Sequence, residues 1–184
     1  MMAKIVGIAG SPRKQGNSTI LLNHVLRGAE EKGAQRLPTI HLNDLTFKGC
    51  QNCGGCDDTG VCILKDDLAL VYESLREANI WVLSSPIYFD GISGQLKLFF
   101  DRLFCFTKKK LPAKRRAVFV IAYEDKKRDD YVKNMRVYQS YLSWFADFES
   151  SEVLQAWGVA AAGDVSKKPE FLEQARELGI RLTS

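Results

Sequence analysis

The sequence predicts a doubly wound α/β domain, in which a parallel β-sheet is covered by helices on both faces. Short apolar runs of the β type alternate along the chain with stretches whose apolar residues recur every three or four positions. Five strands alternating with five helices need crossover connections, and each crossover packs its helix back onto the sheet with one handedness. The strands are therefore expected to be parallel.

The first elements follow from apolar patterning and from the residues that interrupt it. The apolar run 4–9 predicts the first strand. A helix from about Thr19 to Lys32 follows, with Asn17 or Ser18 as the residue that caps its free N–H groups. The second strand, 37–42, contains Pro38, which cannot donate a hydrogen bond to a neighbouring strand. We therefore expect this strand at or near a sheet edge.

The remaining elements repeat the alternation. Asp66 is placed to cap a second helix, and 80–83 predicts a buried strand. The apolar positions of the next helix have i, i+3, i+4, i+7 spacing and are Leu96, Phe99, Phe100 and Leu103. A strand over 117–122, a helix over about 129–145, a short strand over about 153–159 and a helix opened by Pro169 complete the pattern.

Length and composition indicate one globular domain over residues 1–184. A chain of 184 residues has the size of a single domain, and 46% apolar residues supply an ample core. The net charge of +4 is too small to indicate a nucleic-acid or membrane surface. The apolar run near the N-terminus is broken by Gly7 and Gly10, too short for a signal sequence or a membrane span. We expect a cytoplasmic protein.

The loop after the first strand is rich in groups that donate to an anion. Residues 10–19 read GSPRKQGNST and combine hydroxyls, an amide, an arginine and the N–H groups of a helix N-terminus. Five residues separate Gly10 from Gly16, and Asn17 stands where a P-loop has lysine, so neither the P-loop nor the G-x-G-x-x-G pattern is met. The loop favours a phosphomonoester over a nucleoside triphosphate or a dinucleotide; the alternative is an ordinary polar connection.

The loop after the third strand places apolar groups at the same end of the sheet. Residues 84–94 hold Ile87, Tyr88 and Phe89 beside the rigid Pro86. In doubly wound sheets, ligands bind beyond the carboxyl ends of the strands, which also places the loops 43–65 and 123–128 near a ligand. These side chains are suited to the wall of a flat heteroaromatic ring, or alternatively pack under the loop or at a subunit interface.

Together these loops resemble a known family. GSPRKQGNST after the first strand and SPIYFDGISGQLKLFFDR after the third resemble the flavodoxin-like NADPH-dependent FMN reductases. CQNCGGCDDTGVC, which lies between them, is similar to the iron-sulfur flavoprotein branch of that family. The resemblance spans most of the chain and implies a flavodoxin-like three-layer sandwich with a five-stranded parallel sheet in the order 2-1-3-4-5.

The resemblance also implies which residues contact the cofactor. The phosphate of FMN is expected at Ser11, Arg13, Asn17, Ser18 and Thr19. The isoalloxazine ring is expected against Pro86, Ile87, Tyr88 and Phe89, with Ser85 also at the cofactor. Relatives often have a glycine-containing turn after the fourth strand, whereas this chain has Ala122-Tyr123-Glu124-Asp125-Lys126. Either Tyr123 and Glu124 approach the ring, or the segment turns outward and leaves that edge to backbone groups.

Four cysteines crowd into a loop at about 46–65. Cys50, Cys53, Cys56 and Cys62 have the C-x2-C-x2-C-x5-C spacing. They supply the four thiolates that a [4Fe-4S] cluster needs, and the C-x2-C-x2-C run lets a short loop wrap three corners of the cube. Zinc, free thiols and a cycling disulfide are the alternatives. Because the loop leaves the carboxyl end of the second strand, we expect it at the same end of the sheet as the flavin.

Other polar residues receive structural interpretations. The basic segment Lys108, Lys109, Lys110, Lys114, Arg115 and Arg116 precedes the fourth strand, at the end opposite the flavin, and is expected to be a solvated loop. Cys105 lies among apolar residues and is expected to be a buried thiol. Asp101 and Arg102 are expected to pair with each other or across a subunit interface.

The combined interpretation is an FMN-dependent oxidoreductase that moves electrons between a reduced donor and an acceptor. The flavin carries the chemistry, so no side chain need act as a general acid or base. NAD(P)H or a ferredoxin-like carrier is the expected donor, and quinone, oxygen or peroxide the acceptor, in a homodimer or tetramer. One alternative is a cluster-free NAD(P)H-dependent reductase of FMN, quinones or azo compounds. The other is a flavin-binding redox sensor or electron-carrier module.

Overall fold

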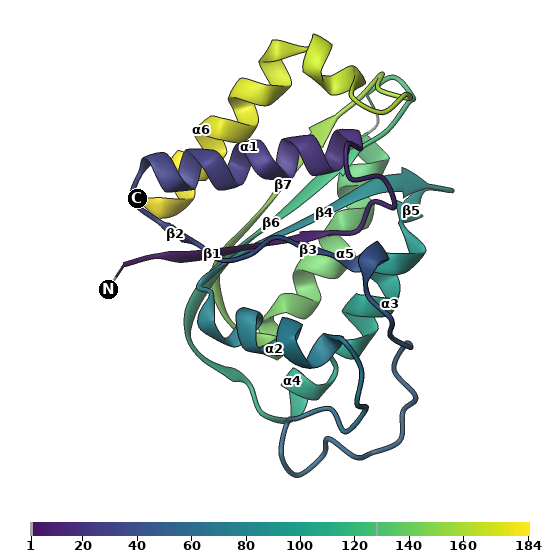
Figure 1. The fold of residues 1–184 in the computed structure, drawn as a ribbon, viewed down its shortest axis with the longest axis vertical. Coiled ribbons are helices and arrows are strands. Elements are labelled where there is room, and N and C mark those ends of the chain that lie inside the picture. Colours follow the sequence, from purple (N-terminus) through teal and green to yellow (C-terminus); the bar gives the residue numbers. More distant parts are fainter. Residues whose placement is uncertain (1, 128) are drawn as a thin grey trace.

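The computed structural model describes residues 2–127 and 129–184, which form a three-layer α/β/α sandwich (Figure 1). Residue 1, the start of the predicted domain, and residue 128, the last of the predicted loop 123–128, lie outside the described residues. The main path of the sheet runs β2-β1-β4-β6-β7, and each neighbouring pair along it is parallel. This path is the predicted five-strand order. Two further short strands, β3 and β5, bring the sheet to seven strands.

The strands on the main path are longer than predicted, except for the first and second. They are β1 (Lys4–Ala9), β2 (Gln35–Arg36), β4 (Ile80–Tyr88), β6 (Leu111–Ala122) and β7 (Ala146–Ala156). β4 continues to residue 88, into the first part of the predicted loop 84–94, and β7 begins earlier than predicted and ends three residues before the predicted end at 159. The added lengths arise because pairing with a neighbouring strand, which a single sequence does not reveal, extends the ladder.

The predicted second strand, 37–42, is wrong as a single element. It is replaced by β2 and β3 (Ile40–His41), which lie on either side of Pro38 and both pair with β1. A proline has no N–H to donate to the ladder, so the strand is interrupted where it stands. The predicted position at the sheet edge is confirmed, since β2 ends the path of the sheet.

Helices cover both faces of the sheet (Figure 1). α1 (Asn17–Glu31) and α6 (Pro169–Thr183) lie on one face; α2 (Leu68–Glu77), α3 (Gly94–Arg102), α4 (Cys105–Lys108) and α5 (Asp129–Phe145) lie on the other. Successive residues of β6 alternate between the two cores: Val118 and Val120 pack toward α1 and α6, whereas Phe119 and Ile121 pack toward α3 and α5. This alternation is that of a strand buried on both faces.

Two glycines allow α1 and α6 to lie in close contact. A Cβ on Gly28 would lie 1.9 Å from the carbonyl oxygen of Arg176, and one on Gly179 would lie 2.0 Å from that of Val25. Only glycine fits at these two positions, so the backbones of α1 and α6 lie directly against each other there. The contact fixes α1, whose N-terminus opens toward the candidate site.

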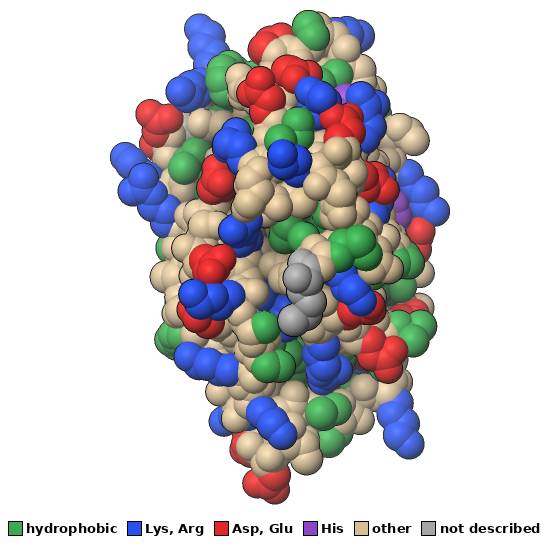
Figure 2. Space-filling model, turned by 90° about the vertical axis from the view of Figure 1, so that its left-hand side faces the viewer, with side chains coloured by type: hydrophobic (Ala, Val, Ile, Leu, Met, Phe, Trp, Pro, Cys, Tyr) green, Lys and Arg blue, Asp and Glu red, His purple; other side chains and the backbone are tan. Residues whose placement is uncertain are grey.

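The surface carries mixed charge. On the face drawn in Figure 2, basic and acidic side chains are interspersed and neither sign forms a broad continuous region. This distribution agrees with the small net charge of +4. No helix of the described residues is long and apolar enough to cross a membrane.

Candidate functional site

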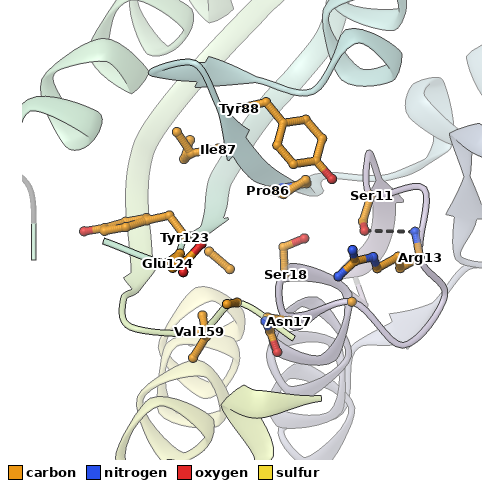
Figure 3. Close-up of a pocket in the computed structure, with 13 residues that line it drawn as sticks. Ser11, Arg13, Asn17, Ser18, Pro86, Ile87, Tyr88, Tyr123, Glu124 and Val159 are labelled. Carbon is orange, nitrogen blue, oxygen red and sulfur yellow. Dashed lines mark hydrogen bonds between the residues drawn. The ribbon is translucent and has the colours of Figure 1, made fainter. Parts of the chain in front are cut away.

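A cavity of about 210 Å³ lies where β1, β4 and β6 end (Figure 3). It brings together nine of the residues that the sequence predicts at the cofactor: Ser11, Arg13, Asn17, Ser18, Pro86, Ile87, Tyr88, Tyr123 and Glu124. In Figure 3, Tyr88 and Pro86 lie across the cavity from Val159 and Asn17, while Tyr123 and Glu124 lie opposite Ser11 and Arg13. Residues from separate loops, which the sequence predicts at the ligand, therefore share one cavity at the carboxyl ends of the strands.

At one end of the cavity, the loop before α1 presents buried polar groups. The Ser11 hydroxyl accepts a hydrogen bond of 3.1 Å from the Arg13 N–H, and the Gly16 N–H donates to the Arg13 carbonyl at 2.9 Å. The Ser18 hydroxyl is buried and has no hydrogen-bond partner among the described residues. An unpartnered buried hydroxyl in the first turn of a helix, on the wall of a cavity, is suited to donate a hydrogen bond to an anionic ligand.

Asn17 lines the cavity and also makes two hydrogen bonds within the protein. Its Nδ2 donates to the Ala161 carbonyl at 2.9 Å, and its Oδ1 accepts from the Val165 N–H at 3.0 Å. The side chain therefore fastens the segment after β7 to α1 with one of its two Nδ2 hydrogens, and its contact with a phosphate stays a prediction. The predicted cap of α1 by Asn17 or Ser18 is wrong: Gly16 occupies the N-cap position, without a side-chain hydrogen bond.

The opposite wall is the end of β4 and the turn that follows it. Ile87 pairs with Ile92 and Tyr88 with Gly91, so β4 and β5 (Gly91–Ile92) form an antiparallel hairpin. Its tip holds Phe89 at φ 48° and Asp90 at φ 63°, a left-handed conformation that turns Phe89 out into solvent. Pro86, Ile87 and Tyr88 line the cavity, whereas the predicted contact of Phe89 is not part of it.

The end of β6 and the two residues after it, Tyr123 and Glu124, form another wall of the cavity. The Tyr123 hydroxyl donates to Gln155 Oε1 at 2.7 Å, and the ring packs edge-on against Tyr131 with centroids 4.7 Å apart. This phenol is held in the core, toward β7, while Glu124 is exposed at the rim. Tyr123 and Glu124 both line the cavity, so the segment does not turn outward as a whole. The Tyr123 hydroxyl, however, is directed to Gln155.

Two further predicted contacts, Thr19 and Ser85, support the walls without lining them. Thr19 Oγ1 donates to the Arg13 carbonyl at 3.4 Å. Ser85 Oγ donates to the Pro86 carbonyl at 2.7 Å and accepts from the Ser93 N–H at 2.8 Å. The Ser93 hydroxyl in turn donates to the Gly10 carbonyl at 2.7 Å. These bonds connect the loop after β1 to the hairpin, and so fix the two walls relative to each other.

Sequence reasoning missed four lining residues, which are Gly16, Ala122, Val159 and Ala160. Val159 and Ala160 follow β7 and lie at the same end of the sheet as the other loops. The rule that ligands bind at strand ends would have included them if it had been extended to the fifth strand. Gly16 and Ala122 contribute backbone and carry no polar side chain to mark them.

The four cysteines lie in an irregular segment. Residues 45–67 are all described and contain no helix or strand after the short turn η1 (Leu42–Asp44). Cys50, Cys53, Cys56 and Cys62 line one small pocket, of about 20 Å³, together with Arg102 and Cys105. Within residues 2–127 and 129–184, no three histidine, cysteine or acidic side chains are gathered closely enough to hold a metal ion. The donors fit a cluster in number and chemistry, but are not already assembled around one point.

The cysteine pocket is separate from the cavity. The two share no lining residue, and Figure 1 shows the cysteine segment running down beside α3 to the bottom of the view, below α2 and α4, whereas the β4–β5 hairpin lies at the right-hand side. The prediction that this loop stays at the flavin end of the sheet is therefore wrong. The segment leaves that end after β3, but then follows the face covered by α2 and α3.

Burial acts on the thiols of this pocket to different extents. Burial, followed by the neighbouring Asp57, raises the pKa of Cys56. Burial also raises the pKa of Cys105 to about 11, and this thiol is 2% exposed. The prediction of a buried thiol at Cys105 is confirmed.

Arg102 and Asp101 do not pair with each other, which is one of the two predicted arrangements. Its guanidinium binds both carboxylate oxygens of Asp66, at 2.6 and 3.1 Å, and Asp101 pairs instead with Lys97 at 2.6 Å. Burial, the largest single effect, lowers the pKa of Arg102, but its hydrogen bond to Asp66 and the neighbouring Tyr72, Cys62 and Asp66 together outweigh burial and raise it. Neighbours on a helix point in different directions, whereas residues four apart share a face, which explains why Asp101 pairs with Lys97 and not with Arg102.

The basic segment is solvated only in part. Lys108, Lys109, Lys110 and Lys114 are exposed, as predicted, and Lys108 pairs with Asp57 of the cysteine segment at 3.0 Å. Arg115 is buried, which contradicts the prediction: it donates to the carbonyls of Arg76, Ala78 and Pro112. Backbone carbonyls at the ends of two elements thus replace water around this guanidinium.

Comparison with known proteins gives one family. The family of NADPH-dependent FMN reductases matches residues 3–138. An iron-sulfur flavoprotein of Archaeoglobus fulgidus is 27% identical over 160 residues, covering 87% of this chain and 66% of that protein. One of Methanocaldococcus jannaschii is 38% identical over 99 residues, covering 54% of this chain and 51% of that protein. The chain thus spans about half to two thirds of the length of these curated relatives.

Solved structures share the fold at low identity. An NAD(P)H:quinone oxidoreductase from Methanothermobacter marburgensis superposes with a TM-score of 0.77 at 18% identity, covering 100% of this chain and 98% of that one. An FMN-dependent NADH-azoreductase from Bacillus anthracis, solved in complex with FMN, has a TM-score of 0.66 at 15% identity and covers both chains completely. At these identities the likeness shows the flavodoxin-like fold.

Proposed function

We propose that this chain, which belongs to the NADPH-dependent FMN reductase family, binds FMN in the cavity at the ends of β1, β4 and β6 and acts as a flavin-dependent oxidoreductase. The observation that carries the proposal is the unpartnered Ser18 hydroxyl, buried in the first turn of α1 and lining that cavity. A phosphate group supplies the acceptor that this hydroxyl lacks, and its negative charge is stabilised at a helix N-terminus.

The residues of the cavity divide by chemistry. Ser11, Ser18 and the backbone N–H groups before α1 are suited to the phosphate, with Arg13 as an exposed cation nearby. Pro86, Ile87 and Tyr88 are suited to the face of the isoalloxazine ring, and Tyr88 is 46% exposed, which leaves that side open to a substrate. Bound FMN supplies the redox chemistry, taking a hydride from NAD(P)H and delivering electrons to an acceptor such as a quinone, oxygen or peroxide.

We further propose that Cys50, Cys53, Cys56 and Cys62 bind a [4Fe-4S] cluster. Four thiols with this spacing line one pocket, and the curated relatives above are named iron-sulfur flavoproteins. The segment carries no helix or strand that would resist drawing the thiols together. The exposed Lys109 and Lys110 lie close to this segment and give it a basic border, suited to an acidic electron carrier of the ferredoxin type.

A second candidate is a cluster-free NAD(P)H-dependent reductase of quinones, azo compounds or FMN. It is favoured by the fact that the thiols of the described residues are not gathered into a metal site. In this case the flavin exchanges electrons directly with small molecules at the open side of the cavity, and the cysteines remain thiols or bind zinc.

The test is the content of FMN, iron and acid-labile sulfide in protein purified without oxygen, for the wild type, Cys53→Ala and Cys105→Ala. Cys105 lines the same pocket but lies outside the motif, so its variant is the matched control. We expect one FMN with about four iron and four sulfide per chain, lost in Cys53→Ala and kept in Cys105→Ala. FMN without iron in the wild type would establish the cluster-free reductase, and no binding of added FMN would refute the proposal altogether.

A further inference from the structure

Arg102 is a buried cation at the end of α3, and it lines the cysteine pocket. Its side chain is 0% exposed. Nη1 donates to the Lys48 carbonyl at 2.7 Å and to Asp66 Oδ2 at 2.6 Å, and Nη2 donates to Asp66 Oδ1 at 3.1 Å. The Tyr72 hydroxyl, from α2, donates to the Arg102 carbonyl at 3.3 Å. Hydrogen bonds therefore fix both the guanidinium and the backbone carbonyl of Arg102.

The two groups that Arg102 binds are the two ends of the cysteine segment. Lys48 lies two residues before Cys50, and Asp66 lies four residues after Cys62. One guanidinium therefore closes the segment 49–65 into a loop. An exposed contact just outside it, in which the Thr46 N–H donates to Asp67 Oδ2 at 2.7 Å, closes the same loop a second time. The Asp66 carboxyl also accepts from the Leu68 N–H at 3.2 Å, which ties the loop to the start of α2.

One donor of Arg102 remains unused. Nε is buried and has no hydrogen-bond partner among the residues that the structure describes. A buried N–H without an acceptor is costly, and it is rarely kept without a reason. The pocket that Arg102 lines is formed largely by the segment with Cys50, Cys53, Cys56 and Cys62, whose sulfurs are acceptors when deprotonated.

We propose that Arg102 is the positioning residue of the four-cysteine site: it closes the segment 49–65 at both ends and supplies Nε–H as a donor to the sulfurs within it. The second half of this statement rests on the proposed cluster; the first half does not. With a cluster bound, a buried positive charge and an N–H donor beside the sulfurs stabilise the more negative, reduced form, and so raise the reduction potential.

The test uses Arg102→Gln and Arg102→Lys, with Arg115→Lys as the matched control. Arg115 is also buried, but it binds only backbone carbonyls and does not line the cysteine pocket. The first readout needs no metal: amide hydrogen exchange over 49–65 and the alkylation rate of the four motif cysteines in the apo protein. Arg102→Gln should raise both by about tenfold or more, as expected for loss of hydrogen bonds to a charged group. Arg102→Lys should have a smaller effect and Arg115→Lys none.

The second readout is the midpoint potential of the cluster, followed by EPR after reconstitution with iron and sulfide. Arg102→Gln should lower it, while Arg102→Lys, which keeps the charge, should lower it less. Unchanged exchange, alkylation and potential in Arg102→Gln would overturn the proposal. If the wild type takes up no iron, the cluster proposal fails, and exchange and alkylation still decide whether Arg102 closes the loop. If Arg102→Gln does not fold, Asp66→Asn removes one of the two anchors and carries the same measurements.

Discussion

The two candidate sites are held in different ways. The cavity at the strand ends is held by the sheet and by bonds between its loops: the Gly10 N–H donates to the Ser84 carbonyl at 2.8 Å, and the hydroxyls of Ser85 and Ser93 bond backbone groups of Ser93 and Gly10. A Cβ at Gly10 would lie 2.9 Å from the Ser84 carbonyl oxygen, so the first and third strands meet there at backbone distance. The cysteine segment has no ladder, and its closure depends on side chains: the buried Arg102, which binds Asp66 and the Lys48 carbonyl, and the exposed contact of Asp67 with the Thr46 N–H.

This difference indicates what each site can tolerate. A wall that is held by strand ends keeps its shape when one side chain is changed, so substitutions there should act on the ligand more than on the protein. A loop that is held by side chains loses its shape with one substitution. The rigid cavity suits a cofactor that binds to a preformed site. The cysteine segment suits four ligands that must move toward one another when a metal cluster is inserted.

The largest effect is expected from Arg102→Ala. Removal of one partner from a buried pair leaves Asp66 without its counter-charge, and should lower the free energy of unfolding by about 3–5 kcal/mol. Urea denaturation of the apo protein measures this loss. Lys97→Ala breaks the exposed pair with Asp101 on the same helix, and should cost less than about 1 kcal/mol. Equal losses in the two variants would contradict the view that closure of the loop depends on Arg102.

A smaller effect, on the ligand alone, is expected from Ser18→Ala. The substitution removes a hydroxyl that has no partner among the described residues, so the stability of the apo protein should not fall. The affinity for FMN should fall by about tenfold or more, the worth of a hydrogen bond to a charged group. Fluorescence titration with FMN measures the affinity.

Ser85→Ala is the control for this prediction. Ser85 Oγ makes two internal hydrogen bonds, so its loss should lower the free energy of unfolding by about 1–3 kcal/mol and affect FMN binding less than Ser18→Ala does. If instead the Ser18 variant is destabilised and binds FMN normally, Ser18 is a structural hydroxyl.

These contrasts also show what the sequence could and could not predict. The cavity was predicted well because strand ends and loop composition are local features, and parallel strands bring their ends together. Phe89 lies outside the cavity because pairing continues β4 into a hairpin, whose tip turns that ring into solvent. The partner of Arg102 is Asp66, 36 residues away in the chain, and only the fold brings the end of α3 to the residues just before α2. The closure of the cysteine loop therefore had no local signal.

Protonation of Asp66 at low pH should weaken its pair with Arg102 and destabilise the protein less than Arg102→Ala does. Burial raises the pKa of Asp66, but the hydrogen bond and charge of Arg102 outweigh it and hold this pKa below its usual value. A depressed carboxyl pKa contributes stability that is fully present above the unfolded value, about 4, and is lost as the pH falls through the folded pKa. The urea midpoint of the wild type should therefore fall below pH 4 more steeply than that of Asp66→Asn. Parallel profiles would show that the pair contributes nothing to stability.

The smallest effect is expected from Arg13→Ala, on FMN binding. Arg13 lines the cavity, but its side chain is exposed, so water and salt screen its attraction for a phosphate. The affinity for FMN should fall by less than about fivefold, corresponding to an exposed ion pair of under 1 kcal/mol, and the difference from the wild type should vanish in 1 M salt. Lys14→Ala, which removes an exposed cation from the same loop that already pairs with Asp44, is the control. A large loss of FMN affinity that persists at high salt would mean that one charged side chain, rather than the hydroxyls and backbone before α1, holds the phosphate. The cavity would then resemble the cysteine segment in depending on a single arginine.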